Sequence, residues 1–546
     1  MPTNAPHNAR RASGQEKGVE TETGKPTDAP RKLKNAALWR ANAIVFVGGA
    51  CTMVLELIAG RLMAPYIGVS LYTWTSIIGV VLAGISLGNY LGGRIADRYA
   101  HPWVLGGVFL TAGVASLAIL PGVVLLSKTP LPNSLHLMNR SLLYSALIFF
   151  LPTTVLGMIT PIVIRRTLQD LGKAGNVVGT IYAVSTVGAI VGTFATGFFL
   201  ISMFGTRTIV SIVAIVLIAL GIGSGAMWRG GRQSAAAMGV LAIFALSLGF
   251  KGSFDAHFLK ESNYYTINVY DWNDEKNNNR QLKVLKLDFL DHSFADPQDP
   301  TFLRYEYEQI FAQFAAYQAR RDPQVKALFV GGGGYTLPRY MEVVYPQSTL
   351  DVVEIDPAVT ETVYEQLGLS PDTRVRTYNQ DGRFFLMSRQ ARAETGPKYG
   401  LVFADAFNDY SVPYHLTTVE FHRLVKGVLA DDGFYMLNVI DDYQKGRFLA
   451  SFAKTLREVF PTVFLVAPEG WLGGTGSGTY VLVATDREYN LGEWLVSPAA
   501  PGLENMRLEV VAPDKLAERI EQNRGIVLTD NFVPVDNMVS FIFAHR

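Results

Sequence analysis

Cysteine and charge are both scarce in this chain of 546 residues. Cys51 is its only cysteine, so no disulfide can form within the chain and no metal site can be built from cysteine ligands. Charged residues make up 17% of the sequence and the formal net charge is +1, so no excess of basic charge points to a nucleic-acid partner. We therefore expect neither a metal nor a nucleic acid among its ligands.

The apolar residues are gathered in one part of the chain. Leu, Ile, Val, Ala, Gly and Phe dominate residues 41–250, whereas the sequence after Lys251 reads as an ordinary water-soluble protein. The length gives room for two or three domains at roughly 100–200 residues each. We predict a disordered cytoplasmic tail over residues 1–36, a transmembrane domain over 37–251, a small β-rich subdomain over 252–322 and a nucleotide-binding domain over 323–546.

Seven segments are candidates for membrane-spanning helices, which need about 20 apolar residues each. They cover residues 43–60, 74–93, 103–127, 142–164, 177–203, 209–227 and 235–250. Lys and Arg favour cytoplasmic loops, and seven spans bring the tail and the basic loops near residues 94–98, 165–173 and 229–232 to one side. We therefore expect a multi-pass protein of the cell (inner) membrane with a cytoplasmic N-terminus. Seven crossings put the C-terminal domain outside, whereas six would leave it in the cytoplasm.

Three features of the predicted transmembrane domain could have a functional or a structural role. Residues 92–98 resemble a cytoplasmic loop of major-facilitator transporters, although a charged turn at a helix end explains them equally well. Glu56 and Arg61 could form a structural ion pair or mark a functional site within the membrane. Small residues allow helices to approach closely, and we expect packing roles for Gly79, Gly84, Gly88, Gly92 and Gly93.

In the C-terminal half, short β-branched runs alternate with helical patterns, which is typical of a parallel α/β sheet covered by helices. The predicted strands cover residues 326–330, 349–354, 375–378, 400–404, 434–439, 462–466 and 479–484. The predicted helices cover residues 337–344, 358–367, 382–392, 419–429 and 447–459. This order predicts a Rossmann-like fold of the methyltransferase type, preceded by the small β subdomain.

Three predicted strands end in residues suited to an adenosine-type ligand. The first ends in the turn Gly331, Gly332 and Gly333, where the backbone can approach a ligand closely. The second ends at Glu354, about 20 residues further on, where a carboxylate can accept hydrogen bonds from ribose hydroxyls. The third ends at Asp381 and Gly382, where the carboxylate could accept from an adenine amino group or cap the following helix.

From about residue 261 the chain resembles the polyamine aminopropyltransferases, or spermidine synthases. Residues 261–269 read Glu-Ser-Asn-Tyr-Tyr-Thr-Ile-Asn-Val, similar to an entry strand Glu-Ser-x-Tyr-Gln-x-Ile-x-Val in the family. Residues 287–288, 305–308 and 403–409 are similar to its Leu-Asp-Gly, Tyr-His-Glu and Asp-Ser-x-Asp segments. The ending over residues 528–537 resembles that of membrane-bound members. The family transfers an aminopropyl group from decarboxylated S-adenosylmethionine to a polyamine such as putrescine.

The resemblance implies roles for named residues. Asp405 is the expected catalytic group, since a carboxylate can attract the protonated amine and then accept its proton. The residues expected to bind the sulfonium nucleoside are Gly331, Gly332, Gly333, Glu354, Asp381, Gly382 and Tyr265. Those expected to bind the polyamine are Asp409, Asp288, Glu308 and Tyr264, with Asn408 as the alternative to Asp409. The other expected partner is the lipid bilayer, and a homodimer is allowed.

One departure from the family keeps other functions open. The family has an Asp after its third glycine that contacts the aminopropyl amine, but this chain has Gly334. Losing that acid removes a repulsion against the carboxylate of intact S-adenosylmethionine, so a methyltransferase is one alternative. A transporter or sensor with a non-catalytic nucleoside-binding domain is another. His292 and His415 are expected in loops, where a histidine is more often a structural hydrogen-bonding group than a catalytic one.

Overall fold

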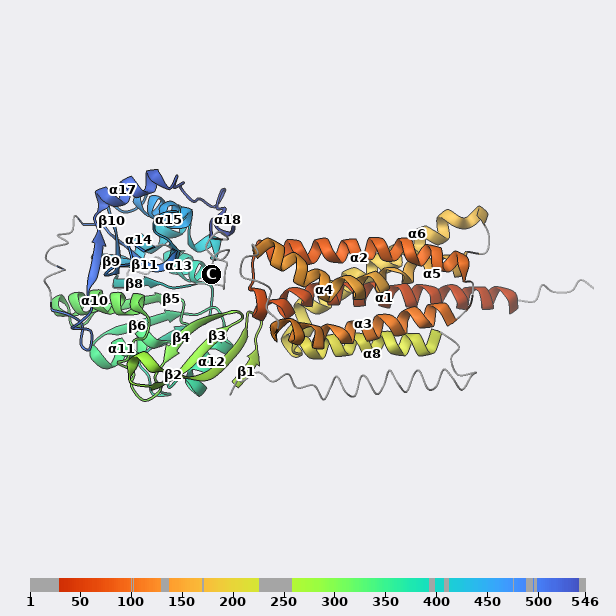
Figure 1. Cartoon of the computed structure of the whole chain (residues 1–546), viewed down its shortest axis with the longest axis horizontal. Helices are drawn as coiled ribbons and strands as arrows, with labels where there is room; N and C mark the ends of the chain where they lie inside the picture. The colour runs from red at the N-terminus through yellow and green to blue at the C-terminus, as the bar shows by residue number, and fades with distance from the viewer. Residues whose placement is uncertain are drawn as a thin grey trace, which may run out of the picture.

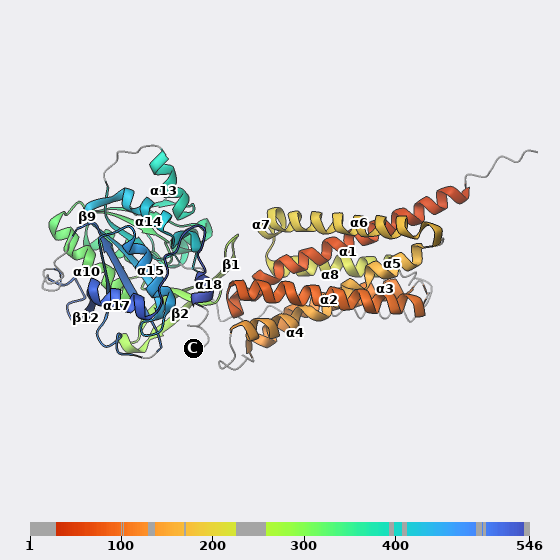
Figure 2. The ribbon, with the colours of Figure 1, turned by 90° about the horizontal axis from the view of Figure 1, so that it is seen from above.

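The computed structural model contains a helical bundle and an α/β domain placed at one end of it (Figures 1 and 2). It describes residues 29–99, 101, 103–128, 137–168, 171–224, 258–391, 398–406, 412–474, 476–487, 494 and 498–539. Of the tail predicted to be disordered over residues 1–36, residues 1–28 lie outside the described residues, whereas residues 29–36 are helical, contrary to the prediction. The predicted seventh span over residues 235–250 also lies outside the described residues. Asn408 and Asp409 do so as well.

The bundle contains six of the seven predicted spans. Six helical stretches within the described residues are long and apolar enough to cross a membrane: Leu38–Ile67, Leu71–Arg98, Trp103–Leu126, Met138–Thr167, Leu171–Met203 and Thr206–Ser224. The elements are α1 (Ala29–Ile67), α2 (Leu71–Arg98), α3 (Trp103–Lys128), α4 (Leu137–Gly157), α5 (Ile159–Thr167), η1 (Leu171–Lys173), α6 (Ala174–Ala195), η2 (Thr196–Leu200), α7 (Ile201–Met203) and α8 (Thr206–Ser224).

Glycine sets the spacing between α2 and α4. A Cβ atom on Gly88 would lie 2.1 Å from the carbonyl oxygen of Thr154, and Gly84 and Gly92 make similarly close approaches. These glycines recur every four residues and so line one face of α2. A Cβ atom on Gly79 or Gly93 would meet none of the described residues within 4 Å, so the expected packing role holds for three of the five glycines.

The small β subdomain is a four-stranded antiparallel sheet in the order β1-β2-β3-β4. Its strands are β1 (Phe258–Glu261), β2 (Thr266–Asp274), β3 (Arg280–Leu287) and β4 (Leu290–Ala295), and η4 (Glu275–Asn277) joins β2 to β3. The single entry strand expected over residues 261–269 is wrong. The hydroxyl of Ser262 accepts hydrogen bonds from the backbone N–H groups of Tyr264 and Tyr265, at 3.0 and 2.9 Å, so the chain turns between β1 and β2.

The α/β domain has an eight-stranded sheet in the order β12-β10-β11-β9-β8-β5-β6-β7. Its strands are β5 (Lys326–Val330), β6 (Thr349–Val353), β7 (Arg376–Tyr378), β8 (Tyr399–Ala404), β9 (Leu429–Asp442), β10 (Thr462–Pro468), β11 (Ser477–Thr485) and β12 (Leu508–Val511). Strands β5 to β9 pair in parallel, whereas β10, β11 and β12 pair antiparallel. This is the predicted methyltransferase-type sheet, with β12 added at one edge.

Helices cover both faces of this sheet (Figure 1). They are α10 (Glu306–Arg321), α11 (Thr336–Val344), α12 (Pro357–Gln366), α13 (Gly382–Ala391), α14 (Val419–Val428), α15 (Arg447–Arg457), α17 (Pro513–Gln522), α18 (Val535–Val539) and the short η5 (Tyr414–Leu416). One apolar core joins Phe311 of α10 to Phe329 and Phe403, and a second core on the other face contains Leu328 and Val402. The alternation of neighbouring residues in β5 and β8 therefore fills both faces.

Candidate active site

Two cavities meet where β5 and β8 end, at the point where the strand order reverses. Ligands of open α/β sheets bind outside the carboxyl ends of strands at such a point. The α10 cavity, of about 200 Å³, is lined by residues that include Glu308, Tyr307 and Asn438. The β6 cavity, also of about 200 Å³, is lined by residues that include Glu354 and Asp381. Four residues line both cavities: His292, Gly331, Gly333 and Asp405.

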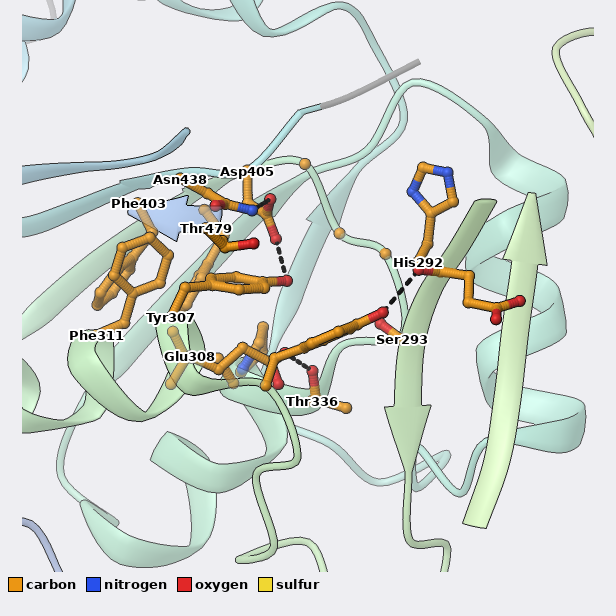
Figure 3. A pocket seen from close by; sticks show the side chains of 18 of the residues that line it. His292, Ser293, Tyr307, Glu308, Phe311, Thr336, Phe403, Asp405, Asn438 and Thr479 are labelled. Carbon is orange, nitrogen blue, oxygen red and sulfur yellow. Dashed lines mark hydrogen bonds between the residues drawn. The ribbon is translucent and has the colours of Figure 1, made fainter. Parts of the chain in front are cut away.

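Asp405 is a half-buried carboxylate at the junction of the two cavities. The hydroxyl of Tyr307 donates to its Oδ2 at 2.7 Å, and Nδ2 of Asn438 donates to its Oδ1 at 2.8 Å (Figure 3). Burial raises the pKa of Asp405, and these two hydrogen bonds oppose that rise. Each oxygen accepts one of these bonds and keeps a further lone pair, so the carboxylate is oriented and can still accept a proton.

Glu308, on α10, is a second acid of the site and is buried. The hydroxyl of Thr336 donates to its Oε1, while its Oε2 has no hydrogen-bond partner among the described residues. Burial is the largest cause that raises the pKa of Glu308 to about 8, and the charge of Asp405 raises it further. An unpartnered buried acceptor costs free energy, so a hydrogen-bond donor on a ligand in this cavity would be favoured.

The electrostatic character of the α10 cavity suits a cation. Its lining includes the acids Asp291, Glu308 and Asp405, but neither Lys nor Arg among the described residues. Burial lowers the pKa of His292 to about 4, so its ring is neutral near pH 7. The aromatic rings of Tyr305, Tyr307, Phe311, Phe329 and Phe403 also line the cavity, and such rings attract cations through their faces.

The glycine turn and Glu354 are joined directly. Gly331 has φ of +99°, and a Cβ there would lie 2.3 Å from the carbonyl oxygen of Asp405, so glycine is required. The N–H groups of Gly332 and Asp356 donate to the two oxygens of Glu354, both at 2.9 Å. Burial raises the pKa of Glu354, and these backbone donors oppose the rise. The carboxylate is thereby fixed at the edge of the β6 cavity.

The position after the third glycine has no room for a side chain. A Cβ on Gly334 would lie 2.5 Å from the Cβ of Ser293 on β4, and the N–H of Gly334 donates to the hydroxyl of Ser293 at 2.9 Å. Ser293 therefore occupies the space that an acidic side chain at residue 334 would need.

Asp381 both caps a helix and lines the β6 cavity. Its Oδ1 accepts from the N–H of Phe384 at 2.9 Å in the first turn of α13, and its Oδ2 is hydrogen-bonded to Nε2 of His415 at 2.7 Å. The bond to His415 is the largest cause that lowers the pKa of Asp381. Neither expected loop histidine lies in an open loop, because His292 is on β4 and His415 on η5.

The structure gathers most of the expected site residues. Lining one or both cavities are Gly331, Gly332, Gly333, Glu354, Asp381, Gly382, Tyr264, Tyr265, Glu308 and Asp405. Asp288 lines neither cavity. It accepts a hydrogen bond from the N–H of Thr266 at 2.8 Å and faces a third cavity, of about 120 Å³, that Arg61 also lines. Burial raises the pKa of Asp288 to about 6.

Sequence reasoning missed Tyr307, Asp291 and Asn438. Tyr307 and Asp291 lie in or beside motifs that were recognised, but nothing local distinguishes them from their neighbours. Asn438 had a signal, because it interrupts the apolar run of β9 and is buried. A polar side chain in a buried strand needs a hydrogen-bond partner, and here the partner is the catalytic candidate.

No family model matches the chain. A polyamine aminopropyltransferase of Vibrio vulnificus is 28% identical over 167 residues, which are 31% of this chain and 52% of that protein. The polyamine aminopropyltransferase 2 of Ralstonia nicotianae is 27% identical over 461 residues, which are 77% of this chain and 83% of that protein. The human eEF1A lysine and N-terminal methyltransferase is 27% identical over 186 residues, covering 32% of this chain and 26% of that protein.

The strand order defines an α/β domain of the methyltransferase type, preceded by a bundle of apolar helices. The chain spans about half of the Vibrio protein and a smaller part of the human one, but most of the Ralstonia protein. It is similar to polyamine aminopropyltransferases, and the similarity to the Ralstonia protein, which covers 77% of this chain, extends into the helical half.

Proposed function

We propose that the chain is a membrane-bound aminopropyltransferase that moves an aminopropyl group from decarboxylated S-adenosylmethionine to a polyamine such as putrescine. The observation that carries the proposal is the position of Asp405. This half-buried carboxylate lies where a cavity rich in acids and aromatic rings meets a cavity with the features of a nucleoside site.

The donor nucleoside fits the β6 cavity. Glu354 would accept hydrogen bonds from the ribose hydroxyls, and Asp381 would accept from the adenine amino group. Both carboxylates line the cavity and keep acceptor capacity beyond the bonds already described. The turn at Gly331 to Gly333 lets the sulfonium end approach the backbone beside Asp405.

The acceptor amine fits the α10 cavity, and Asp405 acts as its base. A primary amine is protonated near pH 7, so the carboxylate first attracts the ammonium and then accepts its proton. The freed nitrogen lone pair forms a bond to the aminopropyl carbon next to sulfur. The carbon–sulfur bond breaks, its electron pair stays on sulfur, and methylthioadenosine leaves as a neutral thioether.

Glu308 favours the decarboxylated donor over the intact one. Its Oε2 has no partner among the described residues and lines the same cavity as Gly331 to Gly333, so an ammonium group there would gain a charge-assisted bond. Burial raises the pKa of Glu308 to about 8. An ammonium group beside it would lower that pKa and keep the acid ionised, whereas the carboxylate of intact S-adenosylmethionine would keep it protonated and would gain no charge-assisted bond. The acid that is absent at Gly334 is thus replaced by one carried on α10.

A methyltransferase is the second candidate, favoured by the missing acid at Gly334 and by the similarity to the human methyltransferase. The test is to incubate the purified full chain with putrescine or spermidine and with each sulfonium donor. Formation of a longer polyamine and methylthioadenosine supports aminopropyl transfer. A methylated product and S-adenosylhomocysteine would replace that assignment with methyl transfer, and no turnover with either donor would favour a binding module.

The course of the chain favours a seventh membrane crossing. Glu261, at the end of β1, accepts hydrogen bonds from the N–H and hydroxyl of Thr206, at 2.7 and 3.1 Å, where α8 begins. Helix α8 has 19 residues, so it leads about 28 Å away from the α/β domain at 1.5 Å per residue. The chain has to return over that distance between Ser224 and Phe258, a stretch outside the described residues that includes the apolar run 235–250.

The charge distribution then gives the orientation. Arg94 and Arg98 end α2, and Arg165 and Arg166 end α5, at the end of the bundle away from the α/β domain (Figure 1). Basic residues favour the cytoplasmic side. The proposal is therefore a cell-membrane protein with a cytoplasmic N-terminus and an active site on the opposite side.

A further inference from the structure

The turn between β1 and β2 is a wall of the β6 cavity that is held by a helix of the bundle. Tyr264 and Tyr265, in this turn, line the cavity. Arg61 of α1 donates from Nη1 to the carbonyl oxygen of Asn263 at 2.7 Å and from Nη2 to the carbonyl oxygen of Ser262. A planar guanidinium presents its N–H groups in a fixed fork, so the two adjacent carbonyls are held in one geometry.

The opposite side of the turn is joined to the strand end that carries Glu354. The hydroxyl of Ser262 donates to Asp356, and it accepts from the N–H groups of Tyr264 and Tyr265. Asp356 also accepts from the N–H of Ala358 at 3.0 Å, at the start of α12, and donates its own N–H to Glu354. The turn is thus held by Arg61 of α1 on one side and by Asp356 on the other, and Asp356 is bonded to Glu354, the acid expected to bind the ribose.

Two further contacts between the bundle and the α/β domain lie outside the turn's backbone. Glu261 accepts from Thr206, and Tyr72 donates to Oδ1 of Asn537 at 2.9 Å. The expected ion pair of Arg61 with Glu56 is not formed in the described part of the chain. Instead the guanidinium of Arg61 contacts the backbone of Ser262 and Asn263, about 200 positions away in sequence.

We propose that Arg61 is a positioning residue for the nucleoside site, so that the helical bundle fixes the wall formed by Tyr264 and Tyr265. Without Arg61 the turn carbonyls lose both charge-assisted bonds, and ordering the turn becomes a cost of nucleoside binding. This inference rests on the proposed function only in assigning the β6 cavity to the nucleoside. It gives the bundle a part in substrate binding as well as in membrane attachment.

The test compares Arg61→Met and Arg61→Lys in the full chain, with Arg165→Met as the matched control. Arg165 pairs with Asp97 at the other end of the bundle, and both side chains are exposed, so its loss has little effect. Calorimetry with methylthioadenosine should show about tenfold weaker binding for Arg61→Met, as expected for a lost charge-assisted bond. Arg61→Lys, which offers a point charge without the fork, should bind with intermediate affinity.

Kinetics separate positioning from chemistry. The KM for the decarboxylated donor should rise in Arg61→Met while kcat stays near that of the unaltered chain, because Arg61 touches no reacting atom. Unchanged nucleoside affinity in Arg61→Met overturns the inference. If that variant does not fold, unchanged affinity in Arg61→Lys overturns it equally. A chain that binds methylthioadenosine but transfers no aminopropyl group would refute the proposed function alone, and one that binds no nucleoside would refute both.

Discussion

The hydroxyl of Tyr307 donates to Oδ2 of Asp405 across 98 positions of sequence, at 2.7 Å. Tyr307 lies in the first turn of α10, whereas Asp405 follows β8. The helix that brings the aromatic lining of the α10 cavity therefore also orients the carboxylate at its entrance. Asn438 of β9 holds the other oxygen, so the acid is fixed by side chains from two separate elements.

Replacing Asp405 by Asn should abolish turnover while leaving nucleoside binding intact. The amide keeps the shape and can still accept the hydrogen bond from Tyr307, but it cannot accept a proton. Loss of a general base lowers rates by about 10²–10⁴-fold, so kcat should fall within that range. Calorimetry with methylthioadenosine should give an affinity close to that of the unaltered chain. Retained turnover would show that another group acts as the general base, and Asp409 would be the first candidate to test.

Replacing Tyr307 by Phe should move the acid limb of the pH profile. The bond from Tyr307 lowers the pKa of Asp405 against the larger effect of burial, so its loss raises that pKa. Asp405 acts in its ionised form, and the rise of kcat/KM with pH should therefore occur at higher pH in the variant. At pH 7 we expect a smaller loss than in Asp405→Asn, about tenfold for one lost bond to a charged group. An unshifted acid limb would show that Asp405 is not the titrating base.

Replacing Glu308 by Gln should weaken the preference for the decarboxylated donor and stabilise the ligand-free chain at high pH. Burial raises the pKa of Glu308 from 4.5 to about 8. Between these values the folded chain binds the proton more tightly than the unfolded chain, so this group makes stability fall as pH rises. Thermal unfolding should therefore give a higher Tm for the variant than for the unaltered chain at pH 8 to 9, and equal values near pH 4.

The matching kinetic result is a loss of donor discrimination. The ratio of kcat/KM for the decarboxylated donor to that for intact S-adenosylmethionine should fall by about tenfold or more, since the charge-assisted bond to the ammonium of the decarboxylated donor is lost. Asp291 offers a control, because it also lines the α10 cavity but already accepts from the hydroxyl of Tyr270. A variant Asp291→Asn with the same loss of discrimination would show that general cavity charge, rather than Glu308, selects the donor.

Much of the α/β domain could be predicted from sequence because its signals are local. The runs that form β5, β6 and β8 are mostly apolar and are followed by a glycine or an acid, so strand ends and the residues expected to face a ligand coincide. The turn over residues 262–265 was missed because the side chain of Ser262 reverses a sequence that otherwise reads as a strand. The contact of Arg61 with that turn joins residues about 200 positions apart, and no local pattern encodes it.

The motif that contains Asp288 does not fix the role of this residue. Its backbone is in the left-handed region, with φ of +51°, and its carboxylate holds the N–H of Thr266. The acid thus stabilises the start of β2, next to Tyr265, and does not line either substrate cavity. A sequence motif places the acid near the site, but it does not determine the direction in which the side chain points.

Introducing the family's acid at residue 334 should destabilise the chain. In Gly334→Asp the new Cβ would lie 2.5 Å from the Cβ of Ser293, and overpacking of this kind costs about 1–3 kcal/mol. Chemical unfolding should show that loss, and the double variant with Ser293→Gly should recover part of it because space is restored. A stable Gly334→Asp variant with improved donor affinity would contradict the inference that Ser293 fills the space that an acidic side chain at residue 334 would need.

The side of the membrane on which the α/β domain lies can be tested by cysteine labelling, because the chain has a single native cysteine. Cys51 is buried in α1, so a Cys51→Ala background allows single reporters to be placed. Lys445 is an exposed residue of the α/β domain, and Asp97 is exposed at the opposite end of the bundle.

If the chain crosses the membrane a seventh time between Ser224 and Phe258, these two positions face opposite sides. A membrane-impermeant maleimide applied to intact spheroplasts should then label Lys445→Cys but leave Asp97→Cys unlabelled until the membrane is permeabilised. No labelling of either variant before permeabilisation would put both positions in the cytoplasm, as six crossings require. Labelling of Asp97→Cys alone would put the active site in the cytoplasm and the basic ends of α2 and α5 outside, against the usual preference of Lys and Arg. Either result would contradict the seventh crossing.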